Sequence, residues 1–336
     1  MKILVIQTAF LGDAILATGV LEKLHHTYPA AKIDYLVRKG NEDLFTDHPY
    51  LHELLVWDKS KNKTGNLLSM IGKVRSGDYE YVINIHRHLS SGLITAFSRS
   101  RNMFGFDKNP LSFLFTKKIP HSLESGRHEI ERNHDLIQEI SDDKPAKPRL
   151  YPSKADFAIV EAYKRKVTSS PADAYITISP ASVWFTKQFP PEKWIEWINA
   201  CHPKSNRIFL LGGPADTALC EEIRLACKDT PIVVLAGKLR MLESAALMSG
   251  AAMNYTNDSA PMHLASAMNA PVTVLYTSTI PKFGFGPLSD NRVIVETKEK
   301  LDCRPCGIHG FRACPKKHFK CALGIRKEDI PVISQA

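Results

Sequence analysis

The first half of the chain contains short apolar runs rich in Val, Ile and Leu, which are typical of strands buried on both faces. The strand candidates are residues 2–7, 33–37, 54–57 and 81–85. Between them the apolar residues take a helical spacing: Leu16, Val20 and Leu24 are four apart, and a second helical stretch covers residues 67–74. Strands that alternate with helices predict βαβ units and an open parallel sheet.

The same alternation restarts near residue 175. Its strand candidates are residues 175–179, 207–211, 232–235, 252–255 and 272–276, and its helix candidates are residues 191–201, 216–227, 242–249 and 261–268. These strands begin 32, 25, 20 and 20 residues apart, which is the pace of successive βα units. We therefore predict two α/β halves with a parallel sheet each. Ligands of such sheets bind outside the carboxyl ends of the strands, so we expect the site in a cleft between the halves.

The domain boundary is expected near a charged helix that two polar stretches bracket, residues 141–149 and 169–171. We predict a first domain over residues 1–168, a second domain over residues 169–325 and a C-terminal tail over residues 326–336. A chain of 336 residues is long enough to bury two such cores.

Composition narrows the class of protein. With 44% hydrophobic and 24% charged residues, the chain is globular rather than disordered or collagen-like. No apolar run approaches the roughly 20 residues of a membrane span, and the N-terminus has no signal-peptide pattern, so we expect a cytoplasmic protein. The net charge of +9 favours an anionic partner: nucleic acid, a phospholipid surface or a phosphorylated small molecule.

Gly12 and Asp13 follow the first strand and open the first helix. Gly12 allows a ligand to approach closely or the backbone to take an unusual angle. Asp13 is either an N-cap, a position that favours Asp, or a carboxylate at the edge of the sheet that can accept a proton. The residues alone leave both interpretations open.

Residues 257–263, Asn-Asp-Ser-Ala-Pro-Met-His, lie between an apolar strand and a helix. Pro261 fits a first helical turn that Asp258 or Ser259 would cap. The N–H groups of such a turn bind phosphate or pyrophosphate, although an ordinary capped helix with His263 as a satisfied polar residue also explains the pattern. No Gly-x-Gly-x-x-Gly follows the first strand and no Walker-type sequence occurs, so neither a dinucleotide site nor a P-loop is supported.

Two more loops end strands of the second half. The loop after residue 179 contains Ser182 and Lys187, and the Lys187 ammonium either reaches a phosphate or leaving group or is simply solvated. Gly212 and Gly213 end the next strand, where they permit close approach of a nucleotide or form a plain tight turn.

Four of the seven cysteines lie close together near the C-terminus. They are Cys303, Cys306, Cys314 and Cys321, with His309 and His318 between them. A tetrahedral zinc site is one interpretation. The last two cysteines lack the Cys-x₂-Cys spacing, so disulfides or reduced packed thiols are the other, and neither interpretation involves the cluster in catalysis.

Together these motifs resemble those of glycosyltransferase family 9, the ADP-heptose:lipopolysaccharide heptosyltransferases, over nearly the whole chain. The matching segments, in the family's order and spacing, are residues 10–13 with 16–18, residues 187–190, residues 211–214 and residues 257–265. The resemblance implies the α/β GT-B fold, with two Rossmann-like domains whose parallel sheets face each other across a cleft. It also implies sugar transfer with inversion from a nucleotide-diphosphate donor, without a metal or another cofactor.

The resemblance assigns roles to single residues. Asp13 would be the base that deprotonates the acceptor, and Lys187 would be a second catalytic residue on the donor diphosphate. The implied donor-binding residues are Ser182, Lys187, Gly212, Gly213, Asp258, Ser259, Ala260 and His263. We take Gly12, Arg87 and Arg132 as acceptor-binding candidates, although each arginine can equally be a solvated surface charge.

The implied donor is ADP-heptose, and the implied acceptor is an anionic lipid A–core precursor. We therefore expect a cytoplasmic protein that binds peripherally to the inner face of the cytoplasmic membrane, where basic residues favour an acidic leaflet. A nucleotide-sugar 2-epimerase of similar fold would need several carboxylates in the second half, where only Asp258 stands out. A nucleic-acid-binding protein fits the charge, but the basic residues are scattered and no recognition module occurs, so we expect no nucleic acid partner.

Overall fold

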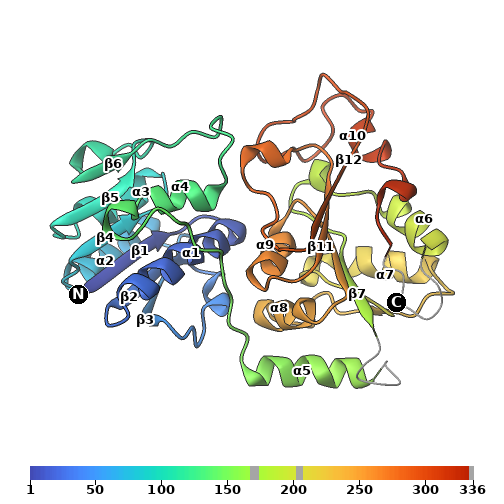
Figure 1. Ribbon diagram of the computed structural model, residues 1–336, viewed down its shortest axis with the longest axis horizontal. Coiled ribbons are helices and arrows are strands. Elements are labelled where there is room, and N and C mark those ends of the chain that lie inside the picture. Colours follow the sequence, from blue (N-terminus) through green and yellow to red (C-terminus); the bar gives the residue numbers. More distant parts are fainter. Residues whose placement is uncertain (167–173, 202–206, 333–336) are drawn as a thin grey trace. The chain divides into compact units, whose positions relative to one another are not determined.

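The computed structural model describes residues 1–166, 174–201 and 207–332, which fall into two compact units, Met1–Tyr151 and Pro152–Ala336. Each unit is an α/β fold built on a parallel sheet (Figure 1). The predicted boundary between residues 168 and 169 lies outside the described residues. Helix α5 (Lys154–Arg165) belongs to the second unit, where it packs against α8 (Met241–Ser249).

The described strands of the first unit form one parallel sheet in the order β3-β2-β1-β4-β5-β6. They are β1 Lys2–Gln7, β2 Lys32–Arg38, β3 Leu51–Trp57, β4 Tyr81–Asn84, β5 Asn102–Phe106 and β6 Lys117–Ile119. The first four confirm predicted strands. The sequence pattern missed β5, which contains Gly105, and β6, which is three residues long and begins with two lysines.

Helices cover both faces of this sheet. They are α1 Leu11–Thr27, α2 Lys63–Arg75, α3 Leu89–Ala96 and α4 Glu129–Asp135. Helix α1 packs against α4, and α2 packs against α3. Successive side chains of a strand point to opposite faces. Leu4 and Ile6 of β1 therefore share one core cluster with Met70 and Val74 of α2, while Ile3 and Val5, also fully buried, point to the other face.

The second unit repeats the strand order of the first. Its sheet runs β12-β11-β10-β7-β8-β9, so that each unit has its first strand beside its fourth, which is the order of the doubly wound Rossmann fold. The strands are β7 Tyr175–Ser179, β8 Arg207–Leu210, β9 Ile232–Val234, β10 Met253–Asn257, β11 Val272–Tyr276 and β12 Arg292–Glu296. The remaining helices are α6 Pro191–Cys201, α7 Thr217–Ala226, α9 Ala260–Ala267 and α10 Lys320–Leu323. Trp194 and Trp197 of α6 fill the core beside Tyr255 of β10.

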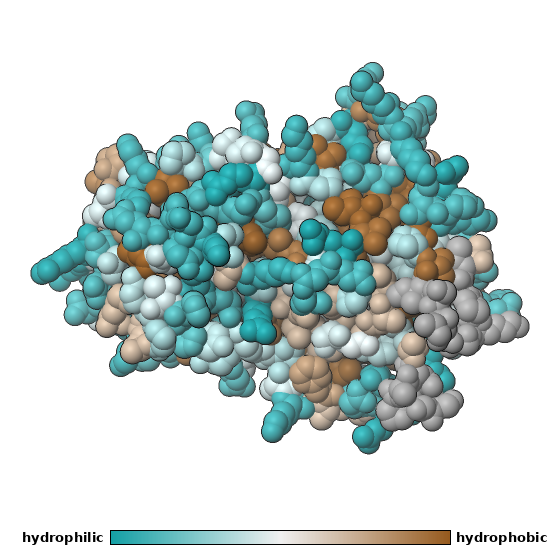
Figure 2. Space-filling view, viewed as in Figure 1, coloured by the Kyte–Doolittle hydropathy of each residue, from teal (hydrophilic) through white to brown (hydrophobic). Residues whose placement is uncertain are grey.

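Hydrophilic residues cover most of the face shown in Figure 2, as the composition predicts for a globular protein. Within the described residues, no helix has both the length and the apolar character needed to cross a membrane.

Two glycines in helices of the first unit differ in how much space surrounds them. A Cβ atom at Gly19 of α1 would lie 2.5 Å from the carbonyl oxygen of Ala146, whereas no described atom lies within 4 Å of one at Gly72 of α2. We expect Gly72→Ala to raise the free energy of unfolding by about 0.5–1 kcal/mol, because Ala is the better helix former. Gly19→Ala should lower it by about 1–3 kcal/mol, because backbone must move. Denaturant unfolding of both variants tests this, and effects of the same sign would contradict the packing of α1 on residue 146.

Candidate active site

The candidate residues follow the central strands of the two sheets. The order of strands reverses between β1 and β4 in the first unit and between β7 and β10 in the second. Loops that leave the carboxyl ends of such neighbouring strands diverge, and ligands of open α/β sheets bind there. Asp13 follows β1 and Arg87 follows β4, while Lys187 follows β7 and Asp258 follows β10.

Asp13 lies in the first turn of α1, whose N-cap is Phe10, so its interpretation as an N-cap is wrong. The pKa of Asp13 is raised to about 6, mainly by burial and in addition by the nearby carboxylate of Glu129. The guanidinium of Arg87 and nearby backbone N–H groups act in the opposite direction. A carboxyl group with this pKa is ionised at neutral pH yet accepts a proton readily, which suits a general base.

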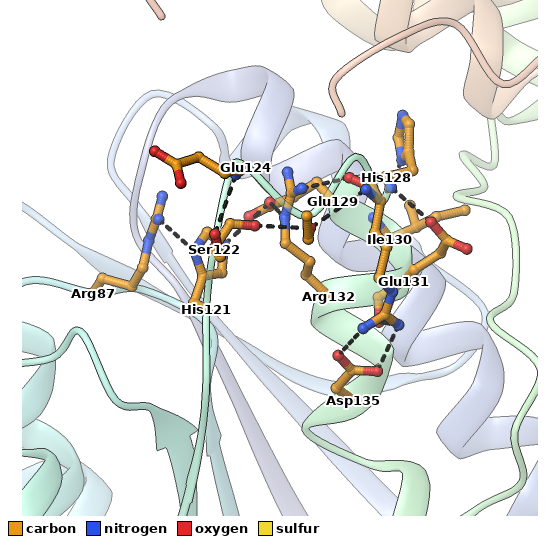
Figure 3. A network of polar contacts seen from close by, with 12 residues as sticks. Arg87, His121, Ser122, Glu124, His128, Glu129, Ile130, Glu131, Arg132 and Asp135 are labelled. Carbon is orange, nitrogen blue, oxygen red and sulfur yellow. Dashed lines mark hydrogen bonds and ion pairs between the residues drawn. The ribbon is translucent and has the colours of Figure 1, made fainter. Parts of the chain in front are cut away.

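Arg87, His121, Glu129 and Arg132 form a hydrogen-bonded network in the first unit, which we call the buried network (Figure 3). Nη1 of Arg87 lies 2.9 Å from Nδ1 of His121. Nε2 of His121 lies 3.3 Å from Oε2 of Glu129, and Nε of Arg132 donates to the same oxygen at 2.7 Å. An arginine N–H can only donate, so Nδ1 of His121 accepts and Nε2 carries the hydrogen that it donates to Glu129. His121 is therefore a neutral ring in a single tautomer.

Glu129 is a buried carboxylate that the sequence analysis missed. Burial alone would raise the pKa of Glu129, but the hydrogen bond from His121 and the charge of Arg132 outweigh it, so the pKa lies below its ordinary value. Glu129 is thus ionised at neutral pH. Helix α4, Glu-Ile-Glu-Arg-Asn-His-Asp, carries too many charges for its sequence to predict a buried face.

The structure separates the three acceptor-binding candidates. Arg132 is buried, with Nε on Glu129 and Nη1 donating to the carbonyl oxygen of Arg127, so its contacts favour a structural role over the predicted acceptor contact. Arg87 is partly exposed and bonded to His121. Gly12 lies beside Asp13 in the first turn of α1.

Lys59 is a further cation at this edge of the sheet, which the sequence analysis did not single out. Its ammonium donates to the carbonyl oxygen of Thr8 at 2.8 Å and to the Thr8 hydroxyl at 2.9 Å, and it lies 4.5 Å from the ring centroid of Trp57. The Thr8 hydroxyl lies 2.9 Å from Nδ1 of His86. Burial lowers the pKa of Lys59 to about 8 and the pKa of His86 to about 3. At pH 7 Lys59 is therefore charged and His86 is neutral.

Lys187 and Asp258 meet in the second unit. Lys187 ends the 3₁₀ helix Phe185–Lys187, and its Nζ lies 2.7 Å from Oδ2 of Asp258, to which the Thr279 hydroxyl donates at 2.6 Å. Only 14% of the Lys187 side chain is exposed, so the interpretation as a solvated loop lysine is wrong. An ammonium has three N–H donors, so Lys187 can hold an oxygen of a second anion while it contacts Asp258.

Asn257 fixes the loop that carries Lys187. Its Nδ2 donates to the carbonyl oxygen of Pro180 at 2.7 Å, and its Oδ1 accepts from the N–H of Phe189 at 2.9 Å. The Asn257 side chain is completely buried. Because both ends of its amide are bonded to the loop, Asn257 positions the Lys187 loop beside β10.

Helix α9 begins at Ala260, two residues after Asp258. Its N-cap is Ser259, and Pro261 lies in its first turn as predicted. Among the described residues the Ser259 side chain makes no capping hydrogen bond, so the first turn, which opens with Ala260, keeps the partial positive charge that favours an anion. His263 is buried further along the same helix.

The loops after β7 and β8 hold the other predicted donor-binding residues. A Cβ atom at Gly212 would lie 2.7 Å from Cβ of Asp216, and the N–H of Gly213 donates to Oδ2 of Asp216 at 2.8 Å. The tight turn therefore suffices to explain glycine at residue 212. Ser182 accepts through its carbonyl oxygen from the Gln188 amide at 2.6 Å, which closes the Lys187 loop on itself.

The clustered cysteines line one cavity of about 320 Å³ together with His318. Cys303, Cys306, Cys314 and Cys321 are all free thiols in the described structure. In the ranges that the structure describes, no three His, Cys, Asp or Glu side chains are grouped as a metal site.

The segment that carries these thiols, residues 303–321, supports the loops around Lys187. The N–H of Phe311 donates to the Thr186 hydroxyl at 2.7 Å, and the N–H of Cys306 donates to the carbonyl oxygen of Ser278 at 2.8 Å. The Arg304 guanidinium donates to the carbonyl oxygen of Thr279 at 2.7 Å. The thiol segment therefore helps to position the loops around the Lys187 and Asp258 pair.

Comparisons with known proteins identify the family and the fold. The family model described as glycosyltransferase family 9 (heptosyltransferase) matches residues 67–308. Lipopolysaccharide heptosyltransferase 3 of Escherichia coli (strain K12) is 27% identical over 283 residues, which are 80% of this chain and 80% of that protein. Among solved structures, the family 9 glycosyltransferase of Veillonella parvula DSM 2008 has a TM-score of 0.79 at 22% identity, covering 88% of this chain and 85% of that one. E. coli ADP-heptose LPS heptosyltransferase II has a TM-score of 0.77 at 20% identity, covering 98% and 96%.

Two parallel sheets with the Rossmann strand order, together with these structural neighbours, define a glycosyltransferase with the GT-B fold. The chain belongs to glycosyltransferase family 9, the heptosyltransferases. This confirms the resemblance found in the sequence and favours a transferase of lipopolysaccharide biosynthesis over a 2-epimerase or a nucleic-acid-binding protein.

The raised pKa of Asp13 has a consequence for stability. Because the native pKa of about 6 lies above the ordinary 3.8, the native state binds this proton more tightly, so stability is lost as the pH rises from about 4 to 6. We expect Asp13→Asn to raise the free energy of unfolding by about 1–3 kcal/mol at pH 8 and to leave it nearly unchanged near pH 4. Denaturant unfolding at both pH values measures the difference.

Asp142→Asn provides the control of opposite sign. Hydrogen bonds from Lys23 and from a backbone N–H lower the pKa of Asp142, so its stabilising effect is present above the ordinary pKa and lost in acid. This variant should lose stability at pH 8. A stabilisation by Asp13→Asn that is equal at both pH values would contradict the raised pKa of Asp13.

Proposed function

We propose that this chain is an inverting, metal-independent glycosyltransferase that moves a heptose from ADP-heptose to an acidic inner-core acceptor of lipopolysaccharide. One observation carries the proposal: each sheet has, where its strand order reverses, the group that one half of this reaction needs. The first unit has a carboxyl group with a raised pKa, Asp13, and the second has Lys187 beside the N-terminus of α9.

Asp13 is the proposed base. As the acceptor oxygen forms its bond to the anomeric carbon, its proton passes to the Asp13 carboxylate. The bond from the anomeric carbon to the diphosphate breaks on the opposite face and its electron pair leaves with the diphosphate, which inverts the configuration. A positioned base contributes about 10²- to 10⁴-fold to the rate, and a pKa near 6 suits proton transfer at neutral pH.

The second unit stabilises the departing diphosphate in this proposal. Lys187 supplies an ammonium, and the first turn of α9 supplies N–H groups that already point along the helix dipole. Such fixed charges need no reorganisation during the reaction, so the charge that a divalent cation would otherwise neutralise is met by the protein. We expect transfer to persist in a metal chelator.

The acceptor is proposed to bind at the carboxyl edge of the first sheet. Arg87 follows β4, and the ammonium of Lys59, which follows β3, contacts Thr8 at the end of β1, the strand beside β4. Two cations at this edge of the sheet suit the phosphate and carboxylate groups of a lipid A–core precursor. The same excess of Lys and Arg favours peripheral binding to the acidic inner face of the cytoplasmic membrane.

The donor assignment rests on the relatives. The E. coli structural neighbour is by its name an ADP-heptose heptosyltransferase. A thermal-shift series with ADP-, GDP- and UDP-sugars tests the assignment, because a ligand stabilises by RT ln(1 + [L]/Kd). Stabilisation by ADP-heptose and not by the other nucleotide sugars supports it, and the reverse selectivity contradicts it.

Asp13→Asn separates the base from donor binding. We expect kcat for transfer to a lipid A–core acceptor to fall by about 10²- to 10⁴-fold, because the amide cannot take the proton. The Kd for ADP-heptose should stay within about twofold of the wild-type value. Retained turnover would exclude Asp13 as the base, and the expected stability of the variant at pH 8 excludes unfolding as the cause of a loss.

Lys187→Met tests the diphosphate contact. Losing a charge-assisted hydrogen bond of about 1.5–3 kcal/mol should raise the Kd for ADP by about tenfold or more. The matched control is Lys193→Met in α6, which removes a lysine that pairs with the exposed Glu196 at 3.0 Å. Equal ADP affinities for both variants, measured by calorimetry, would contradict the role of Lys187.

A further inference from the structure

His121 contacts both groups whose opposite charges face Asp13. The groups that face this carboxylate are Glu129 of α4, Arg87 after β4 and Tyr35 of β2, together with the backbone N–H groups at the start of α1. Tyr35 is neutral and donates its hydroxyl hydrogen to the carbonyl oxygen of Ala14 at 2.9 Å. The charge around Asp13 is therefore set by one anion, Glu129, and one cation, Arg87.

We propose that His121 is a positioning residue that holds Arg87 and Glu129 at fixed places beside Asp13 and so sets the proton affinity of this carboxylate. Nothing in the family assignment gives His121, Glu129 or their contact a role. The inference rests on the proposed function only in so far as Asp13 acts as the base.

The geometry allows the His121 ring one orientation. Its two nitrogens are engaged on opposite sides, Nδ1 with Arg87 at 2.9 Å and Nε2 with Glu129 at 3.3 Å. The backbone N–H of His121 donates to Oδ1 of Asp107 at 3.0 Å, and the ring meets the Phe106 ring edge to face at 4.7 Å. The side chain is almost completely buried. A flipped ring would place the Cδ2–H group against the Arg87 guanidinium and the Cε1–H group against Glu129, so the ring cannot turn without losing both hydrogen bonds.

The neutral ring joins an anion and a cation without adding a charge of its own. Glu129 raises the proton affinity of Asp13 and Arg87 lowers it. Arg132 holds Glu129 from the other side, whereas Arg87 is partly exposed and depends on His121 for its described hydrogen bond. Loss of His121 should therefore release Arg87 more than Glu129, and the proton affinity of Asp13 should rise.

Two substitutions at residue 121 separate its contact with Arg87 from its contact with Glu129, because each keeps one contact and removes the other. The amide of Asn lies near the place of Nδ1 and can still accept from Arg87, whereas the amide of Gln lies near the place of Nε2 and can still donate to Glu129. His121→Asn should therefore keep Arg87 in place, and His121→Gln should release it.

The experiment is a titration of Asp13 by ¹³C NMR in the full-length protein labelled with [γ-¹³C]aspartate, with Asp13→Asn to assign the signal. We expect the titration midpoint to fall by about half a pH unit to one unit in Glu129→Gln and to rise by a similar amount in Arg87→Gln. His121→Gln should shift the midpoint upward like Arg87→Gln, and His121→Asn should shift it less. Asp135→Asn, which removes an α4 carboxylate paired with Arg127 at 2.7 Å, is the matched control and should leave it unchanged.

The pattern of signs decides the proposal. Opposite shifts for Glu129→Gln and Arg87→Gln, with His121→Gln following Arg87→Gln, support it. Shifts of one sign throughout, or a His121→Gln midpoint equal to the wild-type value, overturn it. Thermal unfolding reports whether the buried variants fold, and Arg87→Gln, at a partly exposed residue, keeps the test decisive if they do not.

The acidic limb of the kcat/KM profile against pH should shift with the same signs as the NMR midpoints, which a merely structural role would not produce. The titration needs no substrate, so it separates the two claims. Correct shifts in a protein that transfers no sugar contradict the proposed function alone. Active transfer with unshifted midpoints contradicts the role of His121 alone.

Discussion

The reversal of strand order in each sheet is the constraint on which the rest of the molecule depends. In parallel sheets every strand ends at the same edge, and where the order reverses the loops of two neighbouring strands turn away from each other. Because β7 and β10 are such neighbours and end at the same edge, Lys187 and Asp258, which belong to different βα units, still meet there at 2.7 Å. The buried side-chain amide of Asn257 holds this contact in place, because it joins the end of β10 to both ends of the Lys187 loop.

The first unit holds ionised groups in its interior, and these groups need partners to be stable there. An isolated buried charge costs several kcal/mol, so Glu129 is stable there only because Arg132 and His121 compensate it. The same contacts hold these groups in place when the protonation of Asp13 changes. Burial is the main reason that the pKa of Asp13 reaches about 6, and the charges of Glu129 and Arg87 then act on it in opposite directions.

The parts of the fold that repeat were predictable from the sequence, because burial on both faces leaves a continuous apolar run. Strands β1, β7 and β11 begin and end where the pattern predicted. Helix α4 was not predictable by this means. It buries Glu129 and Arg132 as an ion pair and His134 against the carbonyl oxygen of Asp142, and a pattern of hydrophobic and polar positions cannot show which polar side chains have partners.

The site shows the same division. Asp13, Lys187 and Asp258 could be found, since each lies in the segment that follows a strand whose carboxyl end was recognisable. Their partners could not, because Glu129, His121 and Thr279 lie in other βα units and only tertiary packing brings them near. Arg132 was assigned to a ligand for the same reason: the sequence shows a cation but not the buried carboxylate that it contacts.

Gly310 of the thiol segment packs so closely against Thr186 and Lys187 that it restricts which substitutions both segments can accept. The residue has a φ of +74°, and a Cβ atom there would lie 2.7 Å from the Thr186 hydroxyl and 3.1 Å from Cγ of Lys187. Any larger residue would displace the lysine that we assign to the diphosphate. The thiol segment and the Lys187 loop are distant in the chain, yet a substitution in one requires a compensating substitution in the other. A chimera that takes one of these segments from another family member should therefore need the other segment from the same parent.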